Sequence, residues 1–131
     1  MKRKHYVSVK DYYSRSESRV GYKLLLGDTR HFGYYNSNDS QWHFTDALLR
    51  MEDLLIRRLQ AKSSDHILDA GCGFGHVAKH VAQATDAHVI GIDLISENIH
   101  SAESEPFPKS SVTPEFIVMD YSETSFPDQL F

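Results

Sequence analysis

Residues 67–78 read ILDAGCGFGHVA and place three glycines within five residues, between a short apolar run and a segment with helical periodicity. Gly71, Gly73 and Gly75 can adopt positive φ and let a ligand approach the backbone without a Cβ in the way. A turn that ends a strand and opens a helix also leaves backbone N–H groups that can face a polar or anionic ligand. We therefore expect a nucleotide-like ligand at this turn.

The segments around this turn alternate between strand and helix patterns. Short apolar runs at 66–70, 87–93 and 115–120 predict strands, and helical spacings at 74–85 and 96–105 predict the helices between them, with Ser96 as an N-cap. Such alternation indicates βαβ units with right-handed crossovers. The sequence thus predicts an α/β, Rossmann-like parallel sheet of strand order 3-2-1, with flanking helices, over residues 63–131.

Residues 1–62 form a separate N-terminal helical segment in this reading, a lid or substrate segment. Residues 8–26 predict one or two short helices, and the turn-forming residues at 31–41 predict a loop. Residues 44–62 carry the clearest helical pattern of the chain. Its apolar positions predict a single buried stripe: Phe44, Leu48, Met51, Leu55 and Leu59.

Composition limits the class of protein. A chain of 131 residues with 40% apolar and 24% charged residues is typical of one soluble globular unit, and no run of eighteen apolar residues is present. The first residues lack the apolar stretch of a signal peptide, and the single cysteine cannot form an internal disulfide, so a reducing cytoplasmic location is expected.

Charge is distributed unevenly along the chain. Residues 1–30 hold eight Lys or Arg against three Asp or Glu, whereas the remaining residues hold six against fifteen. A basic arm could contact an acidic partner or a membrane surface weakly. Because its basic residues are interleaved with tyrosines and valines, a solvated helical face is favoured, and no nucleic-acid partner is predicted.

The spacing of the glycine turn discriminates between nucleotide ligands. In the dinucleotide fingerprint G-x-G-x-x-G/A, the third small position would fall on His76. The observed pattern is instead D-x-G-x-G-x-G, with Asp69 two residues before the first glycine. A carboxylate there would repel a pyrophosphate and would suit a cationic ligand. The pattern points away from NAD and towards a ligand with an ammonium and a sulfonium group.

Residues 69–75, DAGCGFG, resemble motif I of class I S-adenosylmethionine-dependent methyltransferases. Asp93, at the end of the second strand, resembles the acid that accepts both ribose hydroxyls, and Asp120 with Tyr121 resembles the pair near the adenine. The resemblance implies S-adenosyl-L-methionine as cofactor. The implied contacts are Asp69, Gly71, Cys72, Gly73, Gly75, Asp93, Leu94, Asp120 and Tyr121.

Residues 12–35 resemble the N-terminal region of small-molecule methyltransferases of the sterol and tocopherol type. The resemblance implies that Tyr34, Tyr35 and Tyr13 line the reaction site, although packing tyrosines with a wet hydroxyl are an equal alternative. The ionisable candidates for a general base are His31, His43 and Glu17, and the sequence does not choose among them.

The remaining candidates favour ordinary roles. His76 and His80 lie four residues apart on a predicted helix, but no H-E-x-x-H pattern is present, and both are expected on the solvent side rather than at a metal. Cys72 is expected to be a small residue that fits the turn rather than a nucleophile. No metal site is therefore predicted.

The resemblance covers only the front half of the family pattern, because ten residues follow Tyr121 where a fourth strand would begin. The predicted function is S-adenosylmethionine-dependent methyl transfer to a small, lipophilic acceptor, with the isolated chain weak or inactive. One alternative is a non-catalytic fragment or partner subunit, in which a second chain completes the open edge at residues 66–70. A dinucleotide-dependent oxidoreductase is disfavoured by Asp69 and His76.

Overall fold

A computed structural model describes residues 11–12, 20–21, 31–37, 43–107 and 112–131. Its elements follow one another as α3 (Phe44–Leu59), β1 (His66–Ala70), α4 (His76–Thr85), β2 (His88–Asp93), α5 (Ser96–Ser104) and β3 (Glu115–Val118). The three strands and the two helices between them lie where the apolar pattern predicts them, within three residues at each end. Within the described ranges, no helix is long and apolar enough to cross a membrane.

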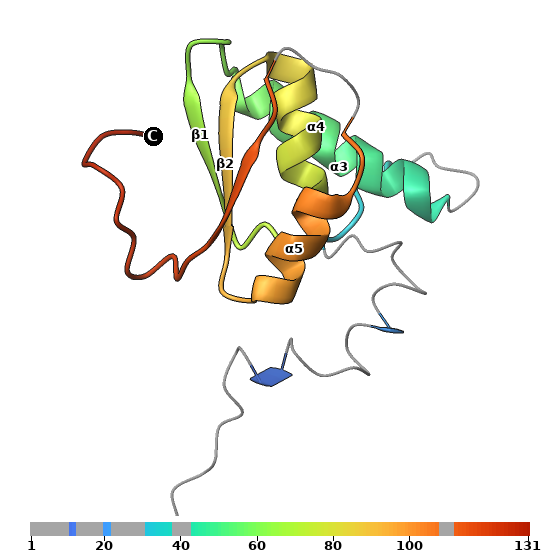
Figure 1. Cartoon of the computed structure of the whole chain (residues 1–131). Coiled ribbons are helices and arrows are strands. Elements are labelled where there is room, and N and C mark those ends of the chain that lie inside the picture. Colours follow the sequence, from blue (N-terminus) through green and yellow to red (C-terminus); the bar gives the residue numbers. More distant parts are fainter. Residues whose placement is uncertain (1–10, 13–19, 22–30, 38–42, 108–111) are drawn as a thin grey trace, which may run out of the picture.

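The three strands form one parallel sheet in the order β1-β2-β3. Asp69 pairs with Gly91, and Asp93 pairs with Val118. Right-handed crossovers between sequential parallel strands bring both connecting helices to the same face. Figure 1 shows α4 and α5 on that face, with α3 beside α4. The predicted α/β, Rossmann-like architecture and its strand order are confirmed.

The hydrophobic core lies between the sheet and α4. Ala78, Val81 and Ala82 on the inner side of α4 pack against Val89 of β2, and all four are at most 3% exposed. The small alanines allow the helix to approach the strands closely. This packing fixes the start of α4, and with it the glycine turn, at the carboxyl end of β1.

The buried side of α3 agrees with the predicted stripe only in part. Leu55 and Leu59 are 44% and 43% exposed, whereas Ala47, Leu48 and Glu52 are buried. The helix is therefore rotated so that a carboxylate faces inward, between residues that can hydrogen bond to it. The apolar periodicity correctly places Leu48 on the buried side but is wrong for Leu55 and Leu59, because it gives no weight to the polar partners that surround Glu52.

Residues 31–37 pack along α3 through close backbone contacts. The N–H of Tyr34 donates to the carbonyl of Ala47 at 2.7 Å, and Arg50 Nε donates to the carbonyl of Tyr34 at 3.1 Å. A Cβ on Gly33 would lie 2.7 Å from the Cβ of Ala47, so only glycine allows this approach. In the same segment, His31 Nε2 lies 2.9 Å from Glu52 Oε1 of α3. The helices predicted within residues 8–26 fall largely outside the described residues, and the division at residue 62 stays a prediction.

Candidate functional site

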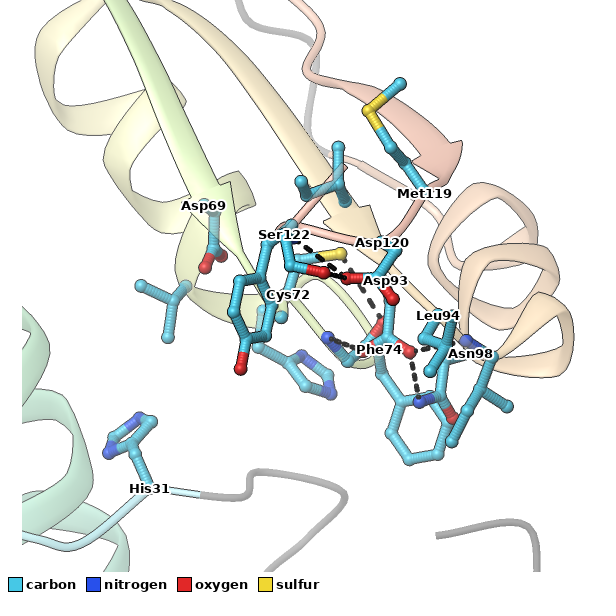
Figure 2. A pocket seen from close by; sticks show the side chains of 17 residues that line it. His31, Asp69, Cys72, Phe74, Asp93, Leu94, Asn98, Met119, Asp120 and Ser122 are labelled. Atoms are coloured by element: carbon cyan, nitrogen blue, oxygen red, sulfur yellow. Dashed lines mark hydrogen bonds between the residues drawn. The ribbon is translucent and has the colours of Figure 1, made fainter. Parts of the chain in front are cut away.

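A cavity of about 550 Å³ lies beyond the carboxyl ends of the three strands (Figure 2). This is the edge at which an open parallel sheet binds its ligands. The glycine turn contributes Asp69, Gly71, Cys72 and Gly73 to the lining, and the ends of β2 and β3 contribute Asp93, Leu94, Asp120 and Tyr121. The structure thus brings together eight of the nine predicted cofactor contacts, while Gly75 does not line the cavity.

The glycines of the turn have two kinds of surroundings. Gly71, Gly73 and Gly75 all have positive φ, of 90°, 55° and 77°. A Cβ on Gly71 or Gly73 would meet nothing within 4 Å, so their backbone is open to a ligand. A Cβ on Gly75 would lie 2.5 Å from the ring of Phe116. Gly75 therefore serves packing at the start of α4, while the other two border the cavity.

The N–H groups of the turn are mostly used within the protein. Gly71 and Cys72 both donate to the carbonyl of Ile92, at 2.8 and 2.9 Å, and Gly75 donates to the carbonyl of Cys72 at 2.9 Å. The N–H of Gly73 donates to Asp93 Oδ2 at 3.0 Å. The expectation of free N–H groups facing an anion is therefore wrong at these four positions. These four N–H groups are therefore not available to bind a pyrophosphate.

Asp93 is held rigidly at the end of β2. Besides Gly73, the N–H of Ile95 donates to its Oδ1 at 2.8 Å, and Asn98 Nδ2 donates to the same oxygen at 3.2 Å. The residue before α5 is Ile95, and Ser96 donates to Glu97 instead of capping the helix, so the predicted Ser96 cap is wrong. The carboxylate of Asp93 accepts the N–H of Ile95 just before α5 begins. These hydrogen bonds fix the orientation of the Asp93 side chain in the cavity.

Asp69 has the electrostatics expected of a site for a cation. Burial raises the pKa of its carboxyl, the charge of Asp93 adds to the rise, and a backbone hydrogen bond from Ala78 and the charge of His31 oppose it. Among the described residues, its Oδ2 is buried and has no hydrogen-bond partner. A bound ammonium group would supply the missing partner and compensate the buried charge.

At β3, Asp120 lies at the rim of the cavity. The hydroxyl and the N–H of Ser122 donate to its Oδ1 at 2.6 and 2.8 Å, and these two bonds lower the pKa of Asp120. Tyr121 is 72% exposed. The pair is therefore accessible to a ligand that enters beside Leu94.

The thiol of Cys72 is unsuited to nucleophilic attack. Burial, followed by the negative charges of Asp69 and Asp93, raises its pKa to about 12. A thiol with such a pKa is protonated at neutral pH, and the thiolate is the reactive form. This supports the interpretation of Cys72 as a small residue that fits beside Gly91.

The predicted lid residues do not all reach the cavity. Tyr34, which is 42% exposed, and Tyr35 lie on the segment that packs along α3 and are not among the lining residues. Tyr13 lies outside the described residues. Their proposed part in the reaction site stays a prediction. The same segment instead contributes His31, one of the three general-base candidates, to the cavity wall.

Two residues in and beside the cavity have no clear signal in the sequence: Asn98 lines it, and Glu52 lies behind the lining residue His31. Asn98 is 1% exposed, and its Oδ1 is buried without a partner in the described part of the chain. Its place on α5, five residues after Asp93, could have suggested it. Glu52 could not be found, because its significance depends on two histidines 21 and 28 residues away.

The expected solvent-side placement of His76 and His80 is also wrong. His76 lines the cavity, and its Nε2 is buried without a partner among the described residues. His80 Nδ1 lies 2.6 Å from Glu52 Oε2. Both histidines face inward because α4 turns this side towards the cavity and α3. Within the described ranges, no group of three or more His, Cys, Asp or Glu side chains could hold a metal ion.

These features fit S-adenosylmethionine, the cofactor implied by the resemblance. The lone oxygen of Asp69 suits the ammonium group, and the open backbone of Gly71 and Gly73 leaves room for the methionine chain. The fixed carboxylate of Asp93 and the amide oxygen of Asn98, which has no partner in the described part of the chain, offer acceptors for hydroxyl or amino donors. The acidic lining disfavours a pyrophosphate in the same place.

Comparison with protein families gives one matching model. The model described as mycolic acid cyclopropane synthetase matches residues 1–123. Among curated proteins, the S-adenosyl-L-methionine-dependent Diels-Alderase iccD of Talaromyces variabilis is 38% identical over 113 residues. That match covers 82% of this chain and 38% of the relative. The sterol 24-C-methyltransferase erg-4 of Neurospora crassa is 30% identical over an alignment of 132 positions, which covers 98% of this chain and 33% of the relative.

A comparison with solved structures finds the same architecture. The [4+2]-cyclase SpnF superimposes with a TM-score of 0.72 at 22% identity, over 92% of this chain and 44% of that structure. At this identity, the likeness shows the fold alone. The chain spans less than half the length of these relatives.

Proposed function

Since this chain belongs to the mycolic acid cyclopropane synthetase family of S-adenosylmethionine-dependent methyltransferases, we propose that the protein transfers a methyl group from S-adenosylmethionine to a small, lipophilic acceptor. Support for a small-molecule acceptor comes from the sterol methyltransferase relative and from the notable resemblance of residues 12–35 to the sterol and tocopherol group. The observation that carries the proposal is the buried Oδ2 of Asp69, which has no hydrogen-bond partner among the described residues and lies beside an open glycine backbone.

The roles that we assign to the chain's residues are mainly binding and orientation. Asp69 would bind the ammonium group, Asp93 the ribose hydroxyls, and Leu94 with Tyr121 would flank the adenine. When bound, S-adenosylmethionine supplies a methyl group on a sulfonium, which is a built-in leaving group. The protein has then to align the acceptor and exclude water, and a general base is required only if the acceptor loses a proton.

The first experiment is a calorimetric titration of the purified protein with S-adenosylmethionine and, separately, with NADH. We expect micromolar binding of S-adenosylmethionine and no binding of NADH, because the acidic lining repels a pyrophosphate. Binding of NADH alone would overturn the proposal in favour of an oxidoreductase. Binding of neither ligand by a folded protein would favour the non-catalytic alternative. Light scattering on the same sample would show whether a second chain associates.

A second candidate function is S-adenosylmethionine-dependent cyclisation of a small molecule. The relative iccD, whose name describes it as a Diels-Alderase, is more similar to this chain than the sterol methyltransferase is. A cycloaddition transfers no methyl group and leaves the cofactor intact. Formation of S-adenosylhomocysteine during incubation with lipophilic acceptors would therefore support methyl transfer, and product formation without it would support cyclisation.

We also propose a cytoplasmic location and a small-molecule partner. The single cysteine, with no second cysteine in the sequence to pair with, is compatible with a reducing compartment. A second chain along the free edge of β1 and a weak membrane contact of the basic residues before position 30 are further predictions. Fractionation of cells that express the tagged protein would test the location and the membrane contact together.

A further inference from the structure

Asn98 places a buried amide in the wall of the cavity. The residue lies in the first turn of α5, lines the cavity and is 1% exposed. Its Nδ2 donates to Asp93 Oδ1 at 3.2 Å, whereas its Oδ1 is buried without a hydrogen-bond partner among the described residues. A buried acceptor that lacks a donor destabilises a fold, so this oxygen needs a donor from a bound ligand.

The contact with Asp93 determines which end of the Asn98 amide is left without a partner. If the amide oxygen and nitrogen exchanged places, two oxygens with no proton between them would face each other. The amide nitrogen therefore stays at Asp93, and the oxygen is the end that lacks a partner. The group that completes Asn98 is a hydrogen-bond donor, such as a hydroxyl.

Asp93 has room for one further hydrogen bond. A carboxylate offers roughly two acceptor sites on each oxygen. Oδ1 already accepts the N–H of Ile95 at 2.8 Å and the amide of Asn98, and Oδ2 accepts the N–H of Gly73 at 3.0 Å. The remaining site is therefore on Oδ2. A second ligand hydroxyl at Asp93 would have to displace one of these three donors from the carboxylate.

Displacement of the amide would leave both ends of Asn98 buried without a partner. Displacement of Gly73 or Ile95 would instead leave a backbone N–H without its acceptor, at the glycine turn or just before α5. Each exchange gains one hydrogen bond and loses another, and a buried donor without an acceptor is costly. Asp93 is therefore suited to a single ligand hydroxyl.

The position of Asn98 in the cavity also fits this role. In the described part of the chain, the buried side-chain atoms without a partner are Asp69 Oδ2, His76 Nε2 and Asn98 Oδ1, and all three residues line the cavity. Figure 2 shows Asn98 next to Asp93 and well apart from Asp69. An extended ligand with its ammonium group at Asp69 therefore reaches Asn98 with a different part of the molecule.

We propose that the two ribose hydroxyls of the cofactor are bound by different residues: one donates to Asp93 Oδ2, and the other donates to Asn98 Oδ1. This inference rests on the proposed function, because the ribose belongs to S-adenosylmethionine. It replaces the expectation that Asp93 accepts both hydroxyls. Neighbouring hydroxyls on one ring suit two acceptors whose side chains are joined by a hydrogen bond.

Calorimetry with S-adenosylhomocysteine and its 2′-deoxy and 3′-deoxy analogues tests the division. With the wild type, we expect each analogue to bind about tenfold more weakly than the parent compound. In Asn98→Leu, one analogue should bind as tightly as the parent compound does, because the hydroxyl that it lacks has no acceptor left. The other analogue should still bind about tenfold more weakly, since Asp93 is unchanged.

The choice of variants separates this effect from changes in packing. Leucine is similar in size to asparagine and occupies the space beside Asp93 Oδ1, so a hydroxyl cannot move into the place of the amide. Gln83→Ala, which removes an exposed amide from α4 outside the cavity lining, should leave all three affinities unchanged. Each comparison is a ratio within one protein, so a sugar conformation that differs between the ligands cancels. Thermal unfolding identifies a variant that does not fold.

Three results would overturn the inference. These are equal weakening of all three ligands in Asn98→Leu, no weakening of any ligand in this variant, and a wild type that binds a deoxy analogue as tightly as the parent compound. The last comparison needs no variant. Tight binding of S-adenosylhomocysteine together with any of these results would leave the proposed function intact. A wild type that does not bind S-adenosylhomocysteine would instead contradict both proposals.

Discussion

The carboxylate of Asp93 accepts a hydrogen bond from the backbone N–H of Gly73, 3.0 Å away, across the base of the cavity. This bond joins the end of β2 to the turn after β1. With the bonds from Ile95 and Asn98 to the other oxygen, it makes Asp93 a structural residue as well as a predicted ribose contact. Substitution there should therefore change both binding and stability.

For Asp93→Ala, we expect binding of S-adenosylmethionine to weaken at least tenfold and the free energy of unfolding to fall by about 2–4 kcal/mol, because donors at Gly73, Ile95 and Asn98 lose their acceptor. Calorimetry and urea denaturation measure the two effects. Asp128→Ala, in the exposed C-terminal residues, is the matched control. A folded Asp93→Ala protein with an unchanged dissociation constant would remove Asp93 from the cofactor site.

Asp69→Asn should raise the stability of the protein while it weakens cofactor binding, whereas Asp93→Ala should lower both. Because burial raises the pKa of Asp69 above its ordinary value of 3.8, the favourable contribution of its protonated form is lost as the pH rises through the folded-state pKa. The asparagine variant should therefore be more stable than the wild type at about pH 7, with a smaller difference at about pH 3. It should also lose affinity for S-adenosylmethionine.

Urea denaturation at several pH values checks the stability effect, and calorimetry checks the binding. Equal stability of the two proteins across this range would show that the buried carboxylate carries no penalty. A variant that is more stable but binds as tightly as the wild type would contradict the assignment of Asp69 to the ammonium group.

Gly75→Ala and Gly73→Ala form a matched pair at positive φ. Gly75→Ala should destabilise the fold more, by about a further 1–3 kcal/mol, since its Cβ would lie 2.5 Å from Phe116. Gly73→Ala meets no protein atom within 4 Å, so its main effect should be weaker cofactor binding. Denaturation and calorimetry on both variants test this division. If Gly73→Ala were the less stable variant, the ring of Phe116 would have to move aside at little cost when a Cβ is added at Gly75.

Cys72 should resist alkylation in the folded protein. Burial and the charges of Asp69 and Asp93 raise its pKa to about 12, so little thiolate is present at about pH 8. We expect iodoacetamide to react at least about a hundredfold more slowly than with the urea-unfolded chain. Mass spectrometry over time measures both rates. Similar rates in the folded and unfolded proteins would mean that the turn opens readily.

Gly33→Ala should displace residues 31–35 from α3. Its Cβ would lie 2.7 Å from the Cβ of Ala47 and 3.0 Å from a backbone carbon of the same residue, which cannot move without the helix. We expect a loss of stability of about 1–3 kcal/mol and a weakened contact between His31 and Glu52. Gly21→Ala, whose Cβ meets nothing within 4 Å, is the control. Equal stability of the two variants would show that the close approach of Gly33 to Ala47 does not contribute to the stability of the fold.

The strands and the glycine turn could be predicted because their signals are local. The short apolar runs at 66–70, 87–93 and 115–120 predicted the strands, and parallel pairing brings the ends of these strands to one edge. The placement of Asp69, Asp93 and Asp120 around one cavity follows from that order alone. The assignment of these residues to a cofactor rested on the resemblance; the matching model shows the family, and the individual contacts stay predictions.

Contacts between distant segments could not be predicted in this way. The apolar stripe of α3 pointed to Leu55 and Leu59, yet the helix buries Glu52, because His31 and His80 approach it from two other segments. Likewise, the turn was expected to offer free N–H groups, but those of Gly71, Cys72, Gly73 and Gly75 are used by Ile92, Asp93 and Cys72.

By itself, the sequence determined the parallel α/β order and the set of acidic and glycine residues at the strand ends, because periodicity and turn chemistry act over a few residues. The tertiary structure alone decided which polar groups are satisfied and which have no partner among the described residues. Hydrogen bonds and burial depend on neighbours in space, and for Asp69, Asn98 and Glu52 these neighbours come from other elements of the fold.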